Sequence, residues 1–143
     1  MNNQILQAAI RYLARREYSE WELTQRLTAK AFEAQAIADV LAELKKNNYQ
    51  SDSRCAESVF RNRVNRGYGW RYIEQELIHK GINAEQITQL RNNQQIDWYN
   101  QAQLAYNKRF GDSPIIDIKD KAKRLRFLQA RGFANDEIFT LFE

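Results

Sequence analysis

The sequence predicts an all-α protein made of three tandem three-helix repeats that form an elongated, curved array. The 143 residues include one proline and five glycines, and strong helix formers such as Leu, Ala, Glu, Gln, Lys and Arg dominate the long runs. A pattern of apolar residues recurs three times along the chain. No run shows the sustained period-two alternation of a half-buried strand, so we expect no sheet.

The repeated pattern is an amphipathic helix, a short stop and a second, shorter helix. The three stops read Lys30-Ala31-Phe32, Lys80-Gly81-Ile82 and Arg131-Gly132-Phe133. Glycine adopts the left-handed conformation that commonly follows a helix without a side-chain clash, and the apolar residue after it can fold back on the last turn. Ala31 departs from the pattern. Either its helix ends differently, or alanine is left-handed there at a cost of roughly 1 kcal/mol.

Two more glycines, Gly67 and Gly69, are expected to act as helix stops like Gly81 and Gly132. Capping residues mark the helix starts, because Ser19 with Glu22 forms a capping box and Asn83 with Gln86 repeats the arrangement. Together with the apolar spacing, these signals predict nine helices, near 4–16, 20–30, 34–47, 52–66, 70–80, 84–93, 97–110, 117–131 and 135–142. The repeats are expected at 1–50, 51–95 and 96–143. Short joints between small helical units favour an elongated array.

Composition and charge are those of a globular protein. Hydrophobic residues make up 43% and charged residues 28% of the chain, the net charge is +4 and the pI is about 9.3. This mildly basic balance favours an acidic or polyanionic partner. The start of the chain is polar throughout and no apolar run is long enough to cross a membrane, so neither a signal peptide nor a membrane span is expected. Cys55 is the only cysteine, which excludes an internal disulfide and suits a reduced cytoplasmic location.

Catalytic chemistry has little support in this sequence. His79 is the only histidine, so the usual dyads would all depend on one residue near a helix C-terminus. Cys55 lies at helical spacing from apolar residues, which predicts a packed thiol and not a nucleophile. The Gly67–Gly69 turn is too short for a dinucleotide fingerprint and follows a helix. We therefore expect a protein that is not an enzyme and that has no cofactor, no metal site and no small-molecule substrate.

Two basic clusters are the candidate partner-binding residues. From Arg54 to Arg71 there are five arginines against one glutamate, and from Lys119 to Arg131 there are six basic residues against one aspartate. The predicted contact residues are Arg61, Arg63, Arg66, Arg71, Lys121, Lys123, Arg124 and Arg126. The first group flanks a turn with Trp70 and Tyr72, and arginine forks beside aromatic rings suit phosphate, nucleic acid or an acidic protein groove.

Each cluster also has a plainer interpretation. The arginines can be solvated while Trp70 and Tyr72 pack inside the repeat, and the second cluster can be a solvated helix face. In the second cluster, Ala122, Leu125 and Leu128 form the expected buried stripe, which leaves the basic residues to face outward. Three-helix units with basic helices are also similar to DNA-binding helix-turn-helix modules, so a stand-alone DNA-binding protein remains the competing class.

Several stretches together resemble the RecX family of bacterial regulatory proteins. Residues 8–27 read AAIRYLARREYSEWELTQRL, and residues 52–54 are followed at 61–82 by RNRVNRGYGWRYIEQELIHKGI. Asp97-Trp98, Lys108–Gly111 and Arg131–Phe133 complete the family's order of motifs, so the resemblance covers essentially the whole chain. The departures are the loss of one of two acidic residues in 49–52, Cys55 in place of an aromatic residue and Ala31 in place of glycine.

The resemblance implies three tandem three-helix repeats and a partner, the RecA filament. It implies binding in the groove of the RecA–DNA filament and inhibition of its ATPase, strand-exchange and co-protease activities, by blocking growth or promoting disassembly. Single- or double-stranded DNA is a further candidate partner. The family offers no catalytic residues to carry over. A pure structural scaffold is the third class, and it would show neither RecA nor DNA binding.

Overall fold

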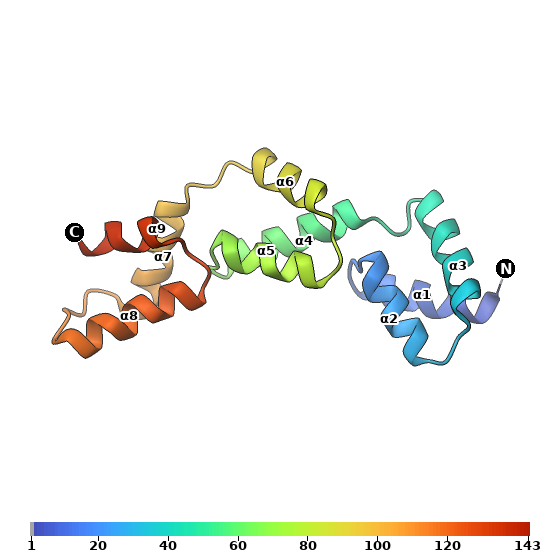
Figure 1. Ribbon diagram of the computed structural model, residues 1–143, viewed down its shortest axis with the longest axis horizontal. Coiled ribbons are helices and arrows are strands. Elements are labelled where there is room, and N and C mark those ends of the chain that lie inside the picture. The colour runs from blue at the N-terminus through green and yellow to red at the C-terminus, as the bar shows by residue number, and fades with distance from the viewer. Residues whose placement is uncertain (1) are drawn as a thin grey trace. The chain divides into compact units, whose positions relative to one another are not determined.

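The computed structural model describes residues 2–143, and its regular structure is helical. Within these residues there are nine α-helices and no strand (Figure 1). The helices are α1 (Asn3–Arg15), α2 (Glu20–Ala29), α3 (Ala34–Lys46), α4 (Asp52–Asn65), α5 (Trp70–His79), α6 (Ala84–Asn93), α7 (Trp98–Phe110), α8 (Ile118–Ala130) and α9 (Asn135–Phe139). The all-α prediction is confirmed. The main difference is at the end, where the last expected helix is a short α9 continued by a 3-10 turn, Thr140–Phe142.

Two compact units make up the chain. One contains the residues up to Ser58 together with Leu77–Thr88, and the other contains Val59–Glu76 together with Gln89–Glu143. Helices α4, α5 and α6 are therefore each divided between the units. The expected repeat boundaries and the elongated, curved arrangement of the repeats stay predictions.

Each unit has its own apolar core. In the first unit, α1, α2 and α3 bury apolar side chains against one another, among them Leu23, Leu27 and Val40, which are fully buried. In the second unit, α7, α8 and α9 bury Leu128, Phe133 and Ile138. Leu23 and Leu27 are four positions apart, a spacing that puts both side chains on one face of α2.

The helix ends share one backbone motif. Gly81 has a φ of 77° and donates its N–H to Ile78 O at 3.0 Å, while Ile82 donates to Leu77 O at 3.1 Å. The same pair of bonds ends the helix before Gly132, whose φ is 94°. These are Schellman motifs, which satisfy two of the carbonyls left free at a helix C-terminus. Gly67, with a φ of 85°, ends α4 in the same way.

Ala31 takes the left-handed conformation that glycine takes in the other repeats. Its φ is 65° and its N–H donates to Thr28 O at 2.9 Å. The second alternative offered by the sequence is therefore correct. An alanine in this region carries a steric cost of about 1 kcal/mol that glycine avoids, while the greater conformational entropy of glycine in the unfolded chain offsets part of the gain. We therefore expect Ala31→Gly to stabilise the protein by less than about 1 kcal/mol. Urea unfolding followed by circular dichroism measures this, and a destabilisation of about 1 kcal/mol would contradict it.

The prediction that Gly69 ends a helix is wrong. Gly69 lies immediately before α5, and its carbonyl accepts a hydrogen bond from the N–H of Ile73 at 3.4 Å. The position needs glycine for a different reason. A Cβ atom added to Gly69 would lie 2.6 Å from the carbonyl carbon of Gly132, so no side chain fits between the two backbones.

Two joints connect successive repeats in the same way. In the first joint, Ser19 at the start of α2 donates its hydroxyl to Lys80 O at the end of α5, at 2.6 Å. In the second joint, Gly69 at the start of α5 donates its N–H to Arg131 O at the end of α8, at 2.7 Å, and Arg71 N donates to Gly132 O at 3.0 Å. Each joint sets a helix N-terminus against a helix C-terminus, an arrangement that the helix dipoles favour.

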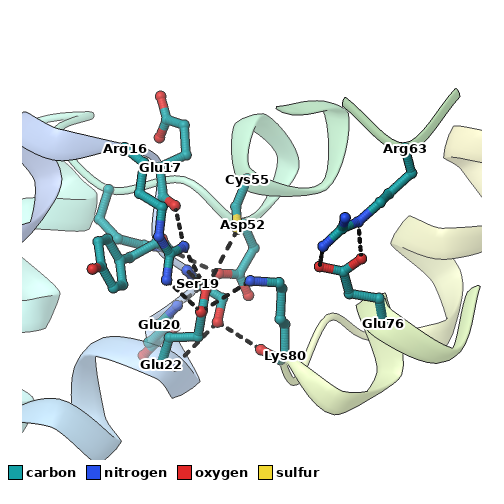
Figure 2. Close-up of polar contacts among 12 residues, drawn as sticks. Arg16, Glu17, Ser19, Glu20, Glu22, Asp52, Cys55, Arg63, Glu76 and Lys80 are labelled. Atoms are coloured by element: carbon teal, nitrogen blue, oxygen red, sulfur yellow. Dashed lines mark hydrogen bonds and ion pairs between the residues drawn. The ribbon is translucent and has the colours of Figure 1, made fainter. Parts of the chain in front are cut away.

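Polar side chains reinforce the first joint (Figure 2). Glu22 completes the capping box with Ser19 and forms ion pairs with Arg16 at 2.9 Å and Lys80 at 3.0 Å. Burial alone would raise the pKa of Glu22. Hydrogen bonds from Arg16, from the Ser19 N–H and from Lys80 outweigh it and lower the pKa to about 2. Glu22 therefore stays charged and holds the joint together over the physiological pH range.

Candidate partner-binding surfaces

The first basic cluster surrounds the turn between α4 and α5. Arg61, Arg66 and Arg71 are exposed, and none of them forms an ion pair within residues 2–143. Arg63 differs, because its guanidinium holds Glu76 with two hydrogen bonds, at 2.6 and 3.2 Å (Figure 2). The Glu76 bond is the largest influence on Arg63 and raises its pKa. Arg63 is thus engaged inside its own unit, and within residues 2–143 the other three predicted contact residues of this cluster are the ones without an ion pair.

The aromatic residues of this cluster are mostly internal. Trp70 is buried and packs against Phe60 and Trp98, with ring centroids 6.2 and 6.3 Å away. Tyr68 and Tyr72 are half-buried and stack on each other at 4.1 Å. The plainer interpretation therefore holds for these rings. They fix the backbone that presents the arginines and do not themselves form an exposed aromatic surface.

The second basic cluster lies on α8, and it divides in the same way. Lys121, Lys123 and Arg126 are exposed and have no ion-pair partner in the described part of the chain. The prediction that Arg124 faces outward is wrong, since only 4% of its surface is exposed. It lies four residues before the buried Leu128 and so shares its helix face.

The Arg124 guanidinium donates its hydrogen bonds to groups of its own unit. Its guanidinium donates to the Tyr106 hydroxyl and to Ser113 O, both at 2.7 Å, and to Pro114 O at 3.2 Å. Two further bonds reach the carboxylate of Asp120. The Tyr106 bond comes first among the influences that raise the pKa of Arg124. The side chain thus holds the loop between α7 and α8 in place, and it has no donor left over for a partner.

A basic pocket lies at the end of α8, where the sequence patterns predict no site. It has a volume of about 200 Å³, and its cationic lining residues are Arg66, Lys108, Arg109 and Arg131. Phe127 forms an apolar wall. Only Arg66 is among the predicted contact residues. The other three cations lie in the short motifs Lys108–Gly111 and Arg131–Phe133. The helical spacing of the sequence does not indicate that the turn after α4 completes the pocket.

Cys55 and His79 lie in different surroundings. Cys55 is 1% exposed, and burial, followed by the charge of Glu22, raises the pKa of its thiol to about 12. The packed thiol predicted from the sequence is confirmed. His79 is exposed in the last turn of α5. No group of three His, Cys, Asp or Glu side chains between residues 2 and 143 is placed to hold a metal ion. In the same part of the chain, every helix is too short or too polar to span a membrane.

The fold and these surfaces define an all-helical repeat protein with exposed basic faces. Models of the first, second and third three-helix domains of RecX match residues 6–44, 51–90 and 95–142. The chain belongs to the RecX family.

Relatives and solved structures agree with this membership. The regulatory protein RecX of Legionella pneumophila is 37% identical over 136 residues, which cover 95% of this chain and 91% of that protein. The RecX of Chromohalobacter salexigens is 42% identical over 130 residues, covering 91% of this chain and 85% of that protein. The crystal structure of RecX from Lactobacillus salivarius aligns with a TM-score of 0.80 at 20% identity, over 97% of this chain and 92% of that one. This last likeness concerns the fold alone.

Proposed function

We propose that this chain binds RecA recombinase filaments and inhibits their ATPase, strand-exchange and co-protease activities. Its membership of a family of regulatory proteins named RecX supports a regulatory role. The observation that carries the proposal further is the set of exposed cations without ion-pair partners in residues 2–143: Arg61, Arg66, Arg71, Lys121, Lys123 and Arg126. A filament of RecA on DNA offers both acidic protein surface and phosphate to such a surface.

Repetition makes this mode of binding effective. The cations come from the second and third predicted repeats, and a filament presents the same partner surface many times along its length. Weak contacts made by linked repeats add through effective concentration, so a small protein can restrain a large assembly. We propose that the protein does this by binding alone, in the cytoplasm, without a cofactor and without catalysis. The buried Cys55 thiol and the exposed position of His79 support that view.

Charge reversal on α8 tests this proposal. We expect Lys121→Glu with Lys123→Glu to raise the protein concentration that half-inhibits RecA ATPase on single-stranded DNA by about tenfold, equivalent to about 1.4 kcal/mol of binding free energy. Reversed charges slow the encounter and weaken the complex. A second pair, Arg61→Glu with Arg71→Glu, should act in the same direction. Both effects should shrink as salt rises, because screening also weakens the wild-type attraction.

The matched control is Arg11→Glu with Lys46→Glu, which changes the net charge equally at exposed residues outside both clusters. It should inhibit nearly as well as the parent, and all variants should melt within a few degrees of it. Equal inhibition by parent and cluster variants at low salt would mean that the basic faces are only solvated surface. Strong DNA binding that persists near physiological salt without RecA would instead favour the stand-alone DNA-binding module.

A further inference from the structure

The segment 111–118, which joins α7 to α8 and includes the first residue of α8, presents apolar side chains to solvent. None of its residues is buried, and Ile115, Ile116 and Ile118 are 40%, 80% and 86% exposed. Single exposed apolar residues are common, but three isoleucines within four positions form a contiguous patch, which is typical of a surface that another molecule covers. None of the three is part of the apolar core of the second unit. The unit therefore leaves this patch uncovered.

The backbone of the segment is nevertheless fixed. The Arg124 guanidinium donates to Ser113 O at 2.7 Å and to Pro114 O at 3.2 Å, and the Ile116 N–H donates to a carboxylate oxygen of Asp120 at 3.2 Å. Burial of a cation has a high free-energy cost, and here the buried Arg124 holds a segment that adds nothing to the core. A segment that is ordered before it binds loses less conformational entropy on binding. The isoleucines are thus preorganised for a contact.

A groove of complementary character lies between α2 and α3 in the first unit. It has a volume of about 420 Å³, which accommodates several aliphatic side chains. Lys45 and Lys46 lie at the end of the groove that the last turn of α3 forms, and Lys46 has no ion pair within residues 2–143. Lys45 pairs with Glu20, the carboxylate of the lining, at 3.2 Å. The apolar lining residues are Ala34, Ile37, Ala38, Leu41 and Ala42.

Polarity and charge both match the segment to the groove. The charged residues of 111–118 are Asp112 and Asp117, and neither forms an ion pair in the part of the chain that the structure describes. With the isoleucines over the apolar lining of the groove, these carboxylates can approach the lysines at its basic end. Opposite charges beside an apolar contact favour one partner and one register. The occupant of the groove that this chemistry indicates is therefore the segment itself.

We propose that the segment 111–118 of one copy of this chain docks in the α2–α3 groove of a second copy. Each chain carries one segment and one groove, so the contact is heterologous and adds copies head to tail. The contact is small, so the association is weak, with a dissociation constant on the order of 100 μM. The proposal involves neither RecA nor DNA, so it stands or falls independently of the proposed function.

Sedimentation equilibrium of the full-length protein tests the proposal. The mean mass of the parent should rise above that of the monomer between roughly 10 and 500 μM, on either side of the expected dissociation constant. Ile116→Ser with Ile118→Ser should weaken the association at least about tenfold, because it removes the apolar patch. Ala38→Gln with Ala42→Gln fills the groove with polar side chains and should weaken it as much. All four residues are exposed, so both pairs should melt within a few degrees of the parent.

Mixing the two variant pairs gives the decisive result. Each pair keeps the surface that the other has lost, so an equimolar mixture should form a dimer and no longer species. A parent or a mixture that stays monomeric up to about 500 μM, well above the expected dissociation constant, would overturn the proposal. Undiminished association of the groove pair would overturn the groove as the docking site.

The matched control is Ile10→Ser with Ile78→Ser, which removes two exposed isoleucines outside both surfaces. It should associate like the parent, and a loss equal to that of the segment pair would mean that exposed apolar surface in general causes the association. Ile116→Ser alone should weaken the association in the same direction as the pair. It leaves the start of α8 unchanged, so the test remains decisive if the pair disturbs that helix.

Discussion

Replacing Gly132 with alanine is expected to destabilise the protein by about 4 kcal/mol, near the upper end of single-substitution effects. Two causes add at this residue. Its φ of 94° is strained for any residue with a Cβ atom. An added Cβ would also lie 2.6 Å from the Cβ of Tyr72 and press on the Tyr72 backbone. That backbone cannot retreat easily, because the neighbouring Arg71 N–H is bonded to Gly132 O.

Substitutions at two other glycines distinguish the cost of backbone strain from the cost of a steric clash. Gly67→Ala imposes a similar φ, of 85°, but its Cβ would meet only ordinary contacts, the nearest at 3.8 Å, so we expect a loss of about 1 kcal/mol. Gly81→Ala should fall between the two, at about 2 kcal/mol, because its Cβ would lie 2.6 Å from Trp21. The clash is with the Cβ of Trp21, which moves only with the backbone of α2, whereas at Gly132 the added Cβ also meets backbone atoms of Tyr72 directly. Urea unfolding gives all three values, and equal losses would mean that the joints are not tightly packed.

Much of this fold follows from local signals that a sequence displays directly. Helix positions depend on apolar spacing, caps and left-handed stops, all of which act within a few residues. The capping box of Ser19 with Glu22 and the stops at Gly81 and Gly132 can therefore be predicted. The joints depend on which helix ends meet. Nothing near Ser19 in the sequence indicates that its hydroxyl donates to the carbonyl of Lys80, sixty-one positions away.

The candidate surfaces, too, can be predicted from the sequence only in part. The exposure of Lys121 and Lys123 is predictable, because the apolar stripe leaves them on the outer side of α8. Arg124 shares a face with Leu128, and that spacing alone would have indicated burial. From the sequence alone a cation is expected at the surface, because burying a charge without partners has a high free-energy cost. Two of those partners are the carbonyls of Ser113 and Pro114, in a loop that carries no regular pattern.

The second large effect concerns the charge at the first joint. We expect Glu22→Gln to destabilise the protein by about 3 kcal/mol at neutral pH. The figure comes from a pKa lowered from its ordinary value of 4.5 to about 2, at about 1.4 kcal/mol per unit. Only 13% of the Glu22 side chain is exposed, so solvent screens its ion pairs with Arg16 and Lys80 weakly. Glutamine can still accept the Ser19 N–H that completes the capping box, so the substitution isolates the charge.

The pH dependence gives this prediction its sharpest form. Because folding lowers the pKa of Glu22, its contribution is fully present above about pH 4.5 and is lost as the pH falls from there toward 2. The free energy of unfolding of the parent should therefore fall steeply over that interval. That of Glu22→Gln should be lower at neutral pH and should fall less over the same interval. Glu57→Gln is the control, since Glu57 is exposed on α4 and has no ion pair within residues 2–143. Urea unfolding at a series of pH values measures all three curves. If the curve for Glu22→Gln ran parallel to that of the parent below pH 4.5, the ion pairs of Glu22 would not be what holds the first joint.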